Sequence, residues 1–114
     1  MKVCLLFICL LFSSVLPAQD INVIRQEYYK AVNSSKETEK LYTKLQSKEI
    51  EDPLLLAYLG SVQALRARFA WNPYHKLSYL SDGLKTLKTA VDRSPDNLEI
   101  RFLRFTLVHY LPRF

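Results

Sequence analysis

The chain of 114 residues has few of the residues that build turns, crosslinks and metal sites. It has two glycines and two histidines, and its two cysteines, Cys4 and Cys9, both lie near the N-terminus. If that segment is removed, no thiol is left for a disulfide, a nucleophile or a metal ligand. The scarcity of glycine and the lack of sustained polar–apolar alternation also argue against a β-sheet fold.

The two histidines do not form a recognisable site. His75 and His109 lie 34 residues apart, and neither has an acidic residue at ligand spacing. A zinc site or acid–base catalysis needs further partners. The sequence therefore predicts no metal and no other cofactor, and it predicts that the protein is not an enzyme.

The first 18 residues have the order of a secretory signal. Lys2 precedes an apolar run from Val3 to Phe12, and small residues then lead to Ala18. The run is shorter than the about 20 apolar residues that a membrane span needs. We therefore predict an exported protein, periplasmic or secreted, with a signal peptide at 1–18 and one helical domain at 19–114. Two alternatives stand beside this prediction: an uncleaved N-terminal anchor, and a domain that is incomplete at its C-terminus.

The net charge of +5 is unevenly distributed. Residues 19–52 hold six basic and seven acidic side chains, whereas residues 53–114 hold nine basic and four acidic ones. The C-terminal half could therefore attract an anionic surface. Export and the lack of a known binding motif argue against nucleic acid as a partner, and no stable membrane span is expected after signal removal.

Apolar spacing and capping signals predict five helices. Asp20, Ser34, Asp52 and Asp96 are the expected N-caps, and Pro53 suits a first helical turn because its missing N–H needs no partner there. Glutamates three residues after Ser34 and Asp96 are typical of capping boxes. The expected ranges are about 21–32, 34–47, 53–70, 74–92 and 96–111.

The third and fourth predicted helices carry apolar stripes beside small residues. Gly83 lies inside the fourth helix, where glycine costs about 1 kcal/mol relative to alanine, so a packing reason is expected. We expect Gly83→Ala to be mild or stabilising and a larger residue to destabilise. The stripe residues are Leu55, Leu59, Val62, Leu65 and Phe69 in the third helix, and Leu77, Leu80, Leu84, Leu87 and Val91 in the fourth.

Gly83, Ala90 and Pro95 have the spacing of the second helix of a tetratricopeptide repeat (TPR), a 34-residue helix–turn–helix unit. Gly83 and Ala90 are seven residues apart, Pro95 follows five later, and "AVDRSPDN" resembles the usual repeat ending. Leu59–Gly60 resembles the pair in a repeat's first helix. The 23 residues from Gly60 to Gly83 exceed the about 12 of a standard repeat, so the chain departs from the pattern there.

The resemblance covers about half of the chain after the signal. It implies an all-α, TPR-like stack of antiparallel helix pairs, with Gly60, Gly83, Ala90 and Pro95 in structural roles. Such stacks form extended concave surfaces that bind peptides or protein segments. The stretch from "WNPYHKL" to "RFLRF" also resembles short exported bacterial proteins of unknown function.

These observations predict a non-enzymatic protein-interaction or scaffold module of the bacterial periplasm or cell envelope. The alternative is a small helical enzyme or ligand carrier with its site at the Trp71–Lys76 corner. Arginine and aromatic residues commonly anchor interfaces. Two arginines of the fifth helix could line a concave face or pair with Asp92 or Asp96. The candidate interaction residues are Arg66, Trp71, Tyr74, His75, Arg101 and Arg104.

The fifth predicted helix is apolar on two sides, and little chain follows it to cover the outer side. Stacked repeats normally end in a helix with a polar outer face. We therefore expect this edge to be covered, either by self-association through the C-terminal helix or by a partner chain. A truncated reading frame would leave the same pattern.

Export should remove the signal near Ala18. Lys2, the apolar run and the small residues at its exit motivate this expectation. The intact mass of protein from the envelope fraction checks it, and a full-length species there would contradict cleavage.

Overall fold

The computed structural model describes residues 21–47 and 49–110, and the regular structure of that part of the chain is helical throughout. A first helical segment at 21–31 is followed by α2 (Ser35–Gln46), α3 (Pro53–Phe69), α4 (Pro73–Arg93) and α5 (Leu98–Tyr110). The all-α prediction is confirmed. The predicted signal peptide and the expected cap Asp20 lie outside the described residues.

Short polar side chains begin α2, α3 and α4. The Oγ of Ser34 accepts a hydrogen bond from the Glu37 amide at 3.2 Å, and Asp52 Oδ1 accepts one from the Leu54 amide at 3.0 Å. These bonds satisfy amides that have no partner within the helix. The predicted capping box also needs a bond from the Ser34 amide to the Glu37 side chain. The Ser34 amide donates instead to the Ala31 carbonyl, so only the first of the two bonds forms. Asn72 caps α4 in the same way, so this helix begins at Pro73, one residue before the predicted start.

The turn before α5 explains why the predicted N-cap Asp96 is wrong. The Asn97 amide donates to the Ser94 carbonyl at 3.2 Å, which closes a turn with Pro95 at its second position. The fixed φ of proline favours that position. Asp96 is thereby the third residue of this turn. The N-cap is Asn97, whose Oδ1 accepts a hydrogen bond from the Ile100 amide at 3.1 Å. The helix therefore begins after Asn97.

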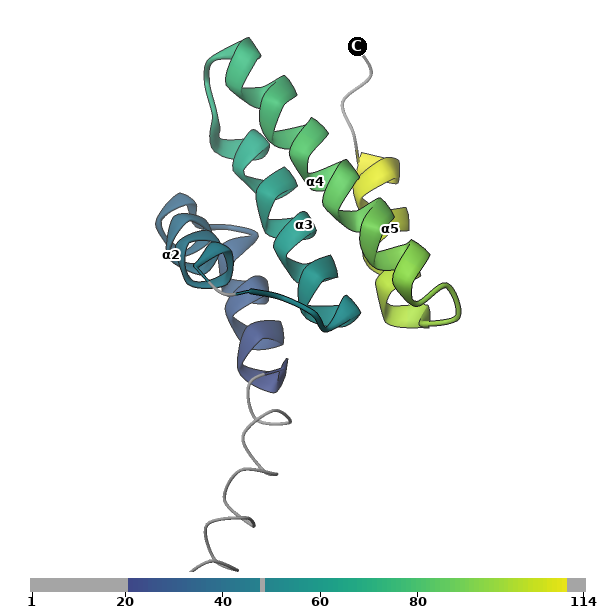
Figure 1. Cartoon of the computed structure of the whole chain (residues 1–114). Coiled ribbons are helices and arrows are strands. Elements are labelled where there is room, and N and C mark those ends of the chain that lie inside the picture. Colours follow the sequence, from purple (N-terminus) through teal and green to yellow (C-terminus); the bar gives the residue numbers. More distant parts are fainter. Residues whose placement is uncertain (1–20, 48, 111–114) are drawn as a thin grey trace, which may run out of the picture.

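The central helix is α3, which packs against α2, α4 and α5. Figure 1 shows α3 and α4 side by side and antiparallel, with α2 on the opposite side of α3 from α5. Because several helices cover α3, its apolar residues surround it instead of forming one stripe. Most of its buried positions are small, and the predicted stripe residues apart from Val62 are only partly buried. The buried set is Ala57, Tyr58, Gly60, Ser61, Val62, Ala64 and Ala67.

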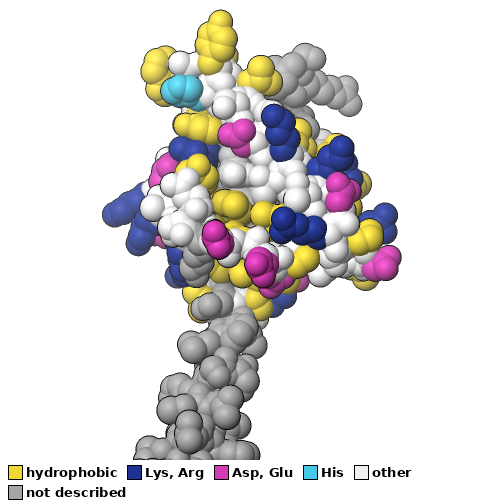
Figure 2. Space-filling model, in the orientation of Figure 1, with side chains coloured by type: hydrophobic (Ala, Val, Ile, Leu, Met, Phe, Trp, Pro, Cys, Tyr) yellow, Lys and Arg dark blue, Asp and Glu magenta, His cyan; other side chains and the backbone are white. Residues whose placement is uncertain are grey.

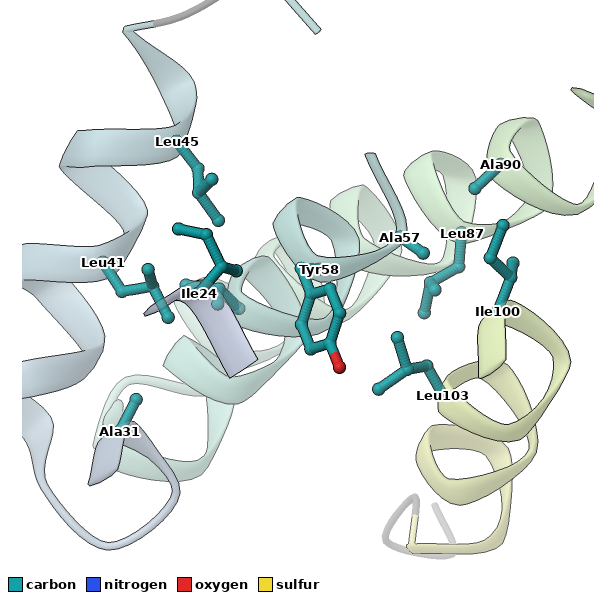
Figure 3. Close-up of a cluster of buried hydrophobic side chains, with 11 residues drawn as sticks. Ile24, Ala31, Leu41, Leu45, Ala57, Tyr58, Leu87, Ala90, Ile100 and Leu103 are labelled. Atoms are coloured by element: carbon teal, nitrogen blue, oxygen red, sulfur yellow. The ribbon is translucent and has the colours of Figure 1, made fainter. Parts of the chain in front are cut away.

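All five helical segments contribute to one core. Figure 3 shows Tyr58 of α3 between two groups of aliphatic side chains, one from the first segment and α2 and the other from α4 and α5. Its ring meets that of Tyr28 edge-on, with centroids 5.6 Å apart. The aliphatic groups are Ile24, Ala31, Leu41 and Leu45 on one side, and Leu87, Ala90, Ile100 and Leu103 on the other.

The backbones of α3 and α4 touch at the two glycines of the chain. A Cβ atom added to Gly83 would lie 2.6 Å from the Gly60 carbonyl oxygen and 2.7 Å from Ala64 Cβ. A Cβ added to Gly60 would lie 3.0 Å from the Gly83 carbonyl oxygen. The predicted close contact at Gly83 is therefore confirmed. The expectation that alanine would be tolerated there is wrong, because a backbone atom occupies the space.

Gly83→Ala should destabilise the fold by about 1–3 kcal/mol, since the added methyl group forces the helices apart. The gain in helix propensity, about 1 kcal/mol, is too small to offset a shift of backbone. Thermal or chemical unfolding checks this, with Lys85→Ala on the exposed side of α4 as the matched control. A Gly83→Ala protein as stable as the parent would mean that the helices do not touch here.

Candidate functional site

The corner between α3 and α4 presents aromatic side chains to solvent. Trp71 is 90% exposed and Tyr74 is 84% exposed. The link between the helices is short, and Asn72 accepts a hydrogen bond from the Tyr74 amide at 2.9 Å. Leu77, predicted as part of the apolar stripe of this helix, is also exposed, one turn into α4. Figure 2 shows hydrophobic side chains gathered over this end of the molecule.

Arg66 lies beneath the corner and joins three helices. Its guanidinium lies between the rings of Tyr42 and Tyr79, 4.0 and 4.2 Å from their centroids. The Nε atom donates to Glu39 Oε1 at 2.9 Å, and Nη2 donates to the Tyr79 hydroxyl at 3.4 Å. A guanidinium stacked on two rings and bonded to a carboxylate is held in one position. Arg66 therefore connects α3 to both α2 and α4.

A small hollow of about 140 Å³ lies beside Arg66. The ring of His75 borders it, 5.9 Å from the ring of Tyr79. The structure thus brings together three of the predicted residues, Arg66, Trp71 and His75, while Tyr74 stands outside the hollow. The hollow is smaller than the about 300 Å³ at which ligand pockets usually begin. Its lining is Ser35, Glu39, Arg66, Phe69, Ala70, Trp71, His75 and Tyr79.

The two predicted arginines of α5 are exposed and do not line this hollow. Arg101 and Arg104 stand on the outer side of the helix. Over residues 21–47 and 49–110, neither forms an ion pair with Asp92 or Asp96. Their charges therefore face solvent.

A polar cluster that no sequence pattern indicated connects the first helical segment to α3 and α5. Arg25 binds Glu99 through two hydrogen bonds, from Nε to Oε2 at 3.0 Å and from Nη2 to Oε1 at 2.8 Å. The hydroxyl of Tyr58 donates to Oε2 of the same carboxylate. Arg25 and Glu99 are 74 residues apart, so no local spacing indicates the pair.

This cluster holds its groups in fixed protonation states. The hydrogen bonds from Arg25, with a smaller contribution from Tyr58, keep the pKa of Glu99 below its ordinary value. Burial, followed by the hydrogen bond to Glu99, raises the pKa of Tyr58, and burial also raises the pKa of Tyr28. Near pH 7 Glu99 is charged and both tyrosines are neutral. A carboxylate held in this way is a poor proton donor, so the cluster serves as a structural tie.

An open groove of about 740 Å³ lies between the first helical segment and α2. Its charged lining has three lysines and three glutamates, which cancel. One opposite pair within it, Lys44 and Glu27, is already joined at 2.7 Å. The groove therefore favours neither sign of ligand charge. The lining is Glu27, Lys30, Glu37, Glu39, Lys40, Leu41, Thr43 and Lys44.

Within the part of the chain that the structure describes, no three His, Cys, Asp or Glu side chains are grouped so that they could hold a metal ion. No helix in that part is long and apolar enough to cross a membrane. Comparison of the chain with protein-family models, curated proteins and solved structures finds no match.

Glu99→Gln should lower stability near pH 7, because Arg25 loses its charged acceptor. The pKa of Glu99 is about 4.5 in the unfolded chain and lower in the folded protein, so the charged carboxylate stabilises the fold at pH values above 4.5. This stabilisation is lost as the pH falls through the lower pKa that Glu99 has in the folded protein. The difference between parent and variant should therefore close in strong acid. Denaturant midpoints at pH 7 and below pH 4 measure it.

The exposed carboxylate of Asp92 provides the control for this experiment, and Asp92→Asn should leave the pH dependence of the parent in place. If Glu99→Gln unfolds at the parent's midpoint at pH 7, the ion pair does not stabilise the fold.

Proposed function

We propose that this protein is an exported, non-enzymatic protein-interaction module whose helices stack in the manner of tetratricopeptide repeats. Its partner is a protein or peptide of the cell envelope. The contact is made by the corner between α3 and α4, through Trp71 and Tyr74.

The observation that carries this proposal is the exposure of two large aromatic side chains at the short turn between two packed helices. Tryptophan and tyrosine are among the residues that contribute most binding energy at protein interfaces. Here they follow a well-packed helix and lie at the capped start of α4. Because the backbone is already ordered, a partner that buries these rings loses little further conformational entropy.

The packing of the α3–α4 pair supports the helical-stack part of the proposal. The two helices are antiparallel and touch at Gly60 and Gly83, where the repeat pattern has its small residues. Ala90, the next small position of that pattern, is fully buried. α5 then packs against both helices, as the first helix of a following pair would.

The same corner gives less support to an enzyme or a ligand carrier. The hollow beside it holds about 140 Å³, and the guanidinium of Arg66 is already bonded to Glu39 and stacked between two rings. A small molecule would find few polar groups without partners. A protein surface needs no deep pocket and can cover the protruding rings directly.

A photo-crosslinking residue placed at position 77, beside the exposed rings, tests the proposal in the cells that make the protein. We expect a defined protein adduct, which should weaken by about tenfold or more when Trp71→Ala and Tyr74→Ala are combined. Both side chains are exposed, so the fold should survive, and circular dichroism can verify this.

Tyr29→Ala is the matched control, because Tyr29 is 80% exposed on the first helical segment and does not line the hollow beside the corner. It should leave the adduct unchanged. An adduct that persists in the corner variant, or that falls equally in the Tyr29 variant, would contradict the proposed site.

A further inference from the structure

The outer face of α5 combines exposed apolar side chains with exposed cations. Leu98 is 80% exposed, and Phe102 and Phe105 are each 66% exposed. Arg101 and Arg104 of the same helix are also exposed. Exposed apolar side chains scattered singly are ordinary, but several on one helix usually mark a contact surface.

Helical geometry places these residues in an ordered way. At about 100° per residue, Leu98, Phe102 and Phe105 lie within an arc of about 60°. Ile100 and Leu103, which are buried against the core, lie on the opposite side. The three apolar side chains therefore form a ridge that points directly away from the protein.

The charged residues of α5 lie on the two flanks of this ridge. By the same rotation, Arg101 and Arg104 lie on one flank and Glu99 on the other. Glu99 is bonded to Arg25 and Tyr58, which offsets its charge. The ridge is thus bordered on one side by two cations, and the carboxylate on its other side is already neutralised.

These features favour an anionic surface that can receive a protruding ridge. A second copy packed face to face with α5 antiparallel would bring Arg101 and Arg104 toward their own equivalents, and like charges repel. With the two helices parallel, the arginines would face Glu99 of the other copy, whose charge is already offset by Arg25. A folded partner would need an apolar groove with an acidic rim. A bilayer with anionic lipids offers both properties without any special shape, because its interface accepts aromatic and aliphatic side chains and its phosphates attract arginine.

We propose that the outer face of α5 binds the surface of a membrane that contains anionic phospholipids. Leu98, Phe102 and Phe105 enter the headgroup region, and Arg101 and Arg104 contact the lipid phosphates. The contact is peripheral and reversible, and it is separate from the corner at Trp71. The protein would then present its corner to a partner while α5 rests on the membrane.

Co-sedimentation with lipid vesicles tests this contact, with the protein purified as the cell exports it. Vesicles of phosphatidylcholine mixed with phosphatidylglycerol should bind the protein, and vesicles of phosphatidylcholine alone should bind it far less. Combining Phe102→Ser with Phe105→Ser should reduce binding to the anionic vesicles by about tenfold or more. Combining Arg101→Gln with Arg104→Gln should reduce it by about thirtyfold and remove most of its dependence on salt.

Two control variants change the same residue types elsewhere. Tyr29→Ser removes an exposed ring from the first helical segment, and Lys36→Gln with Lys40→Gln removes two exposed cations from α2. Both should bind like the parent.

The proposal is overturned if the parent does not bind anionic vesicles, if neutral vesicles bind it equally, or if controls and α5 variants lose binding alike. It is also overturned if light scattering shows a dimer that Phe102→Ser dissociates while vesicles do not compete, because a second copy then covers this face.

Discussion

The close contact between α3 and α4 at Gly60 and Gly83 is the constraint on which the rest of the structure depends. With no side chain between them, the two backbones meet directly, and the small residues of α3 can be buried completely. This spacing brings Leu87 and Ala90 into the same core as Ile100 and Leu103, so α5 can pack against both helices. It also fixes the direction in which the short α3–α4 link projects its aromatic side chains.

Long-range polar contacts then attach the outer helices to this pair. Arg66 reaches from α3 to Glu39 on α2 and to Tyr79 on α4, while Glu99 of α5 holds Arg25 of the first segment. These contacts engage many of the groups that a ligand site would use. Among the described residues, the aromatic corner and the ridge of α5 remain exposed, and they differ in that exposed arginines border only the ridge.

The sequence predicted what depends on neighbours within one turn of helix. Ser34 and Asp52 were identified as caps because a short polar side chain bonds an amide two or three residues ahead. The contact at Gly83 was also predictable, since glycine inside a helix needs a packing reason. The cap of α5 was misplaced by one residue, because the turn at Pro95 uses Asp96.

What the sequence could not indicate depends on residues brought together from far apart. The bond between Arg25 and Glu99 spans 74 positions, and the rings that enclose Arg66 come from two other helices. The corner was predicted as a site from its residue types, but the partial burial of Arg66 and the exposure of Leu77 follow only from the packing of the helices.

The contact between the two glycines can be measured directly, because the chain contains no others. A sample labelled only at glycine gives two sets of α-proton signals, so a nuclear Overhauser cross-peak between them has one assignment. We expect such a cross-peak, together with one from Gly83 to the Ala64 methyl group, whose carbon lies close to Gly83. If both glycines are observed in the folded protein and neither cross-peak is present, α3 and α4 do not meet as described.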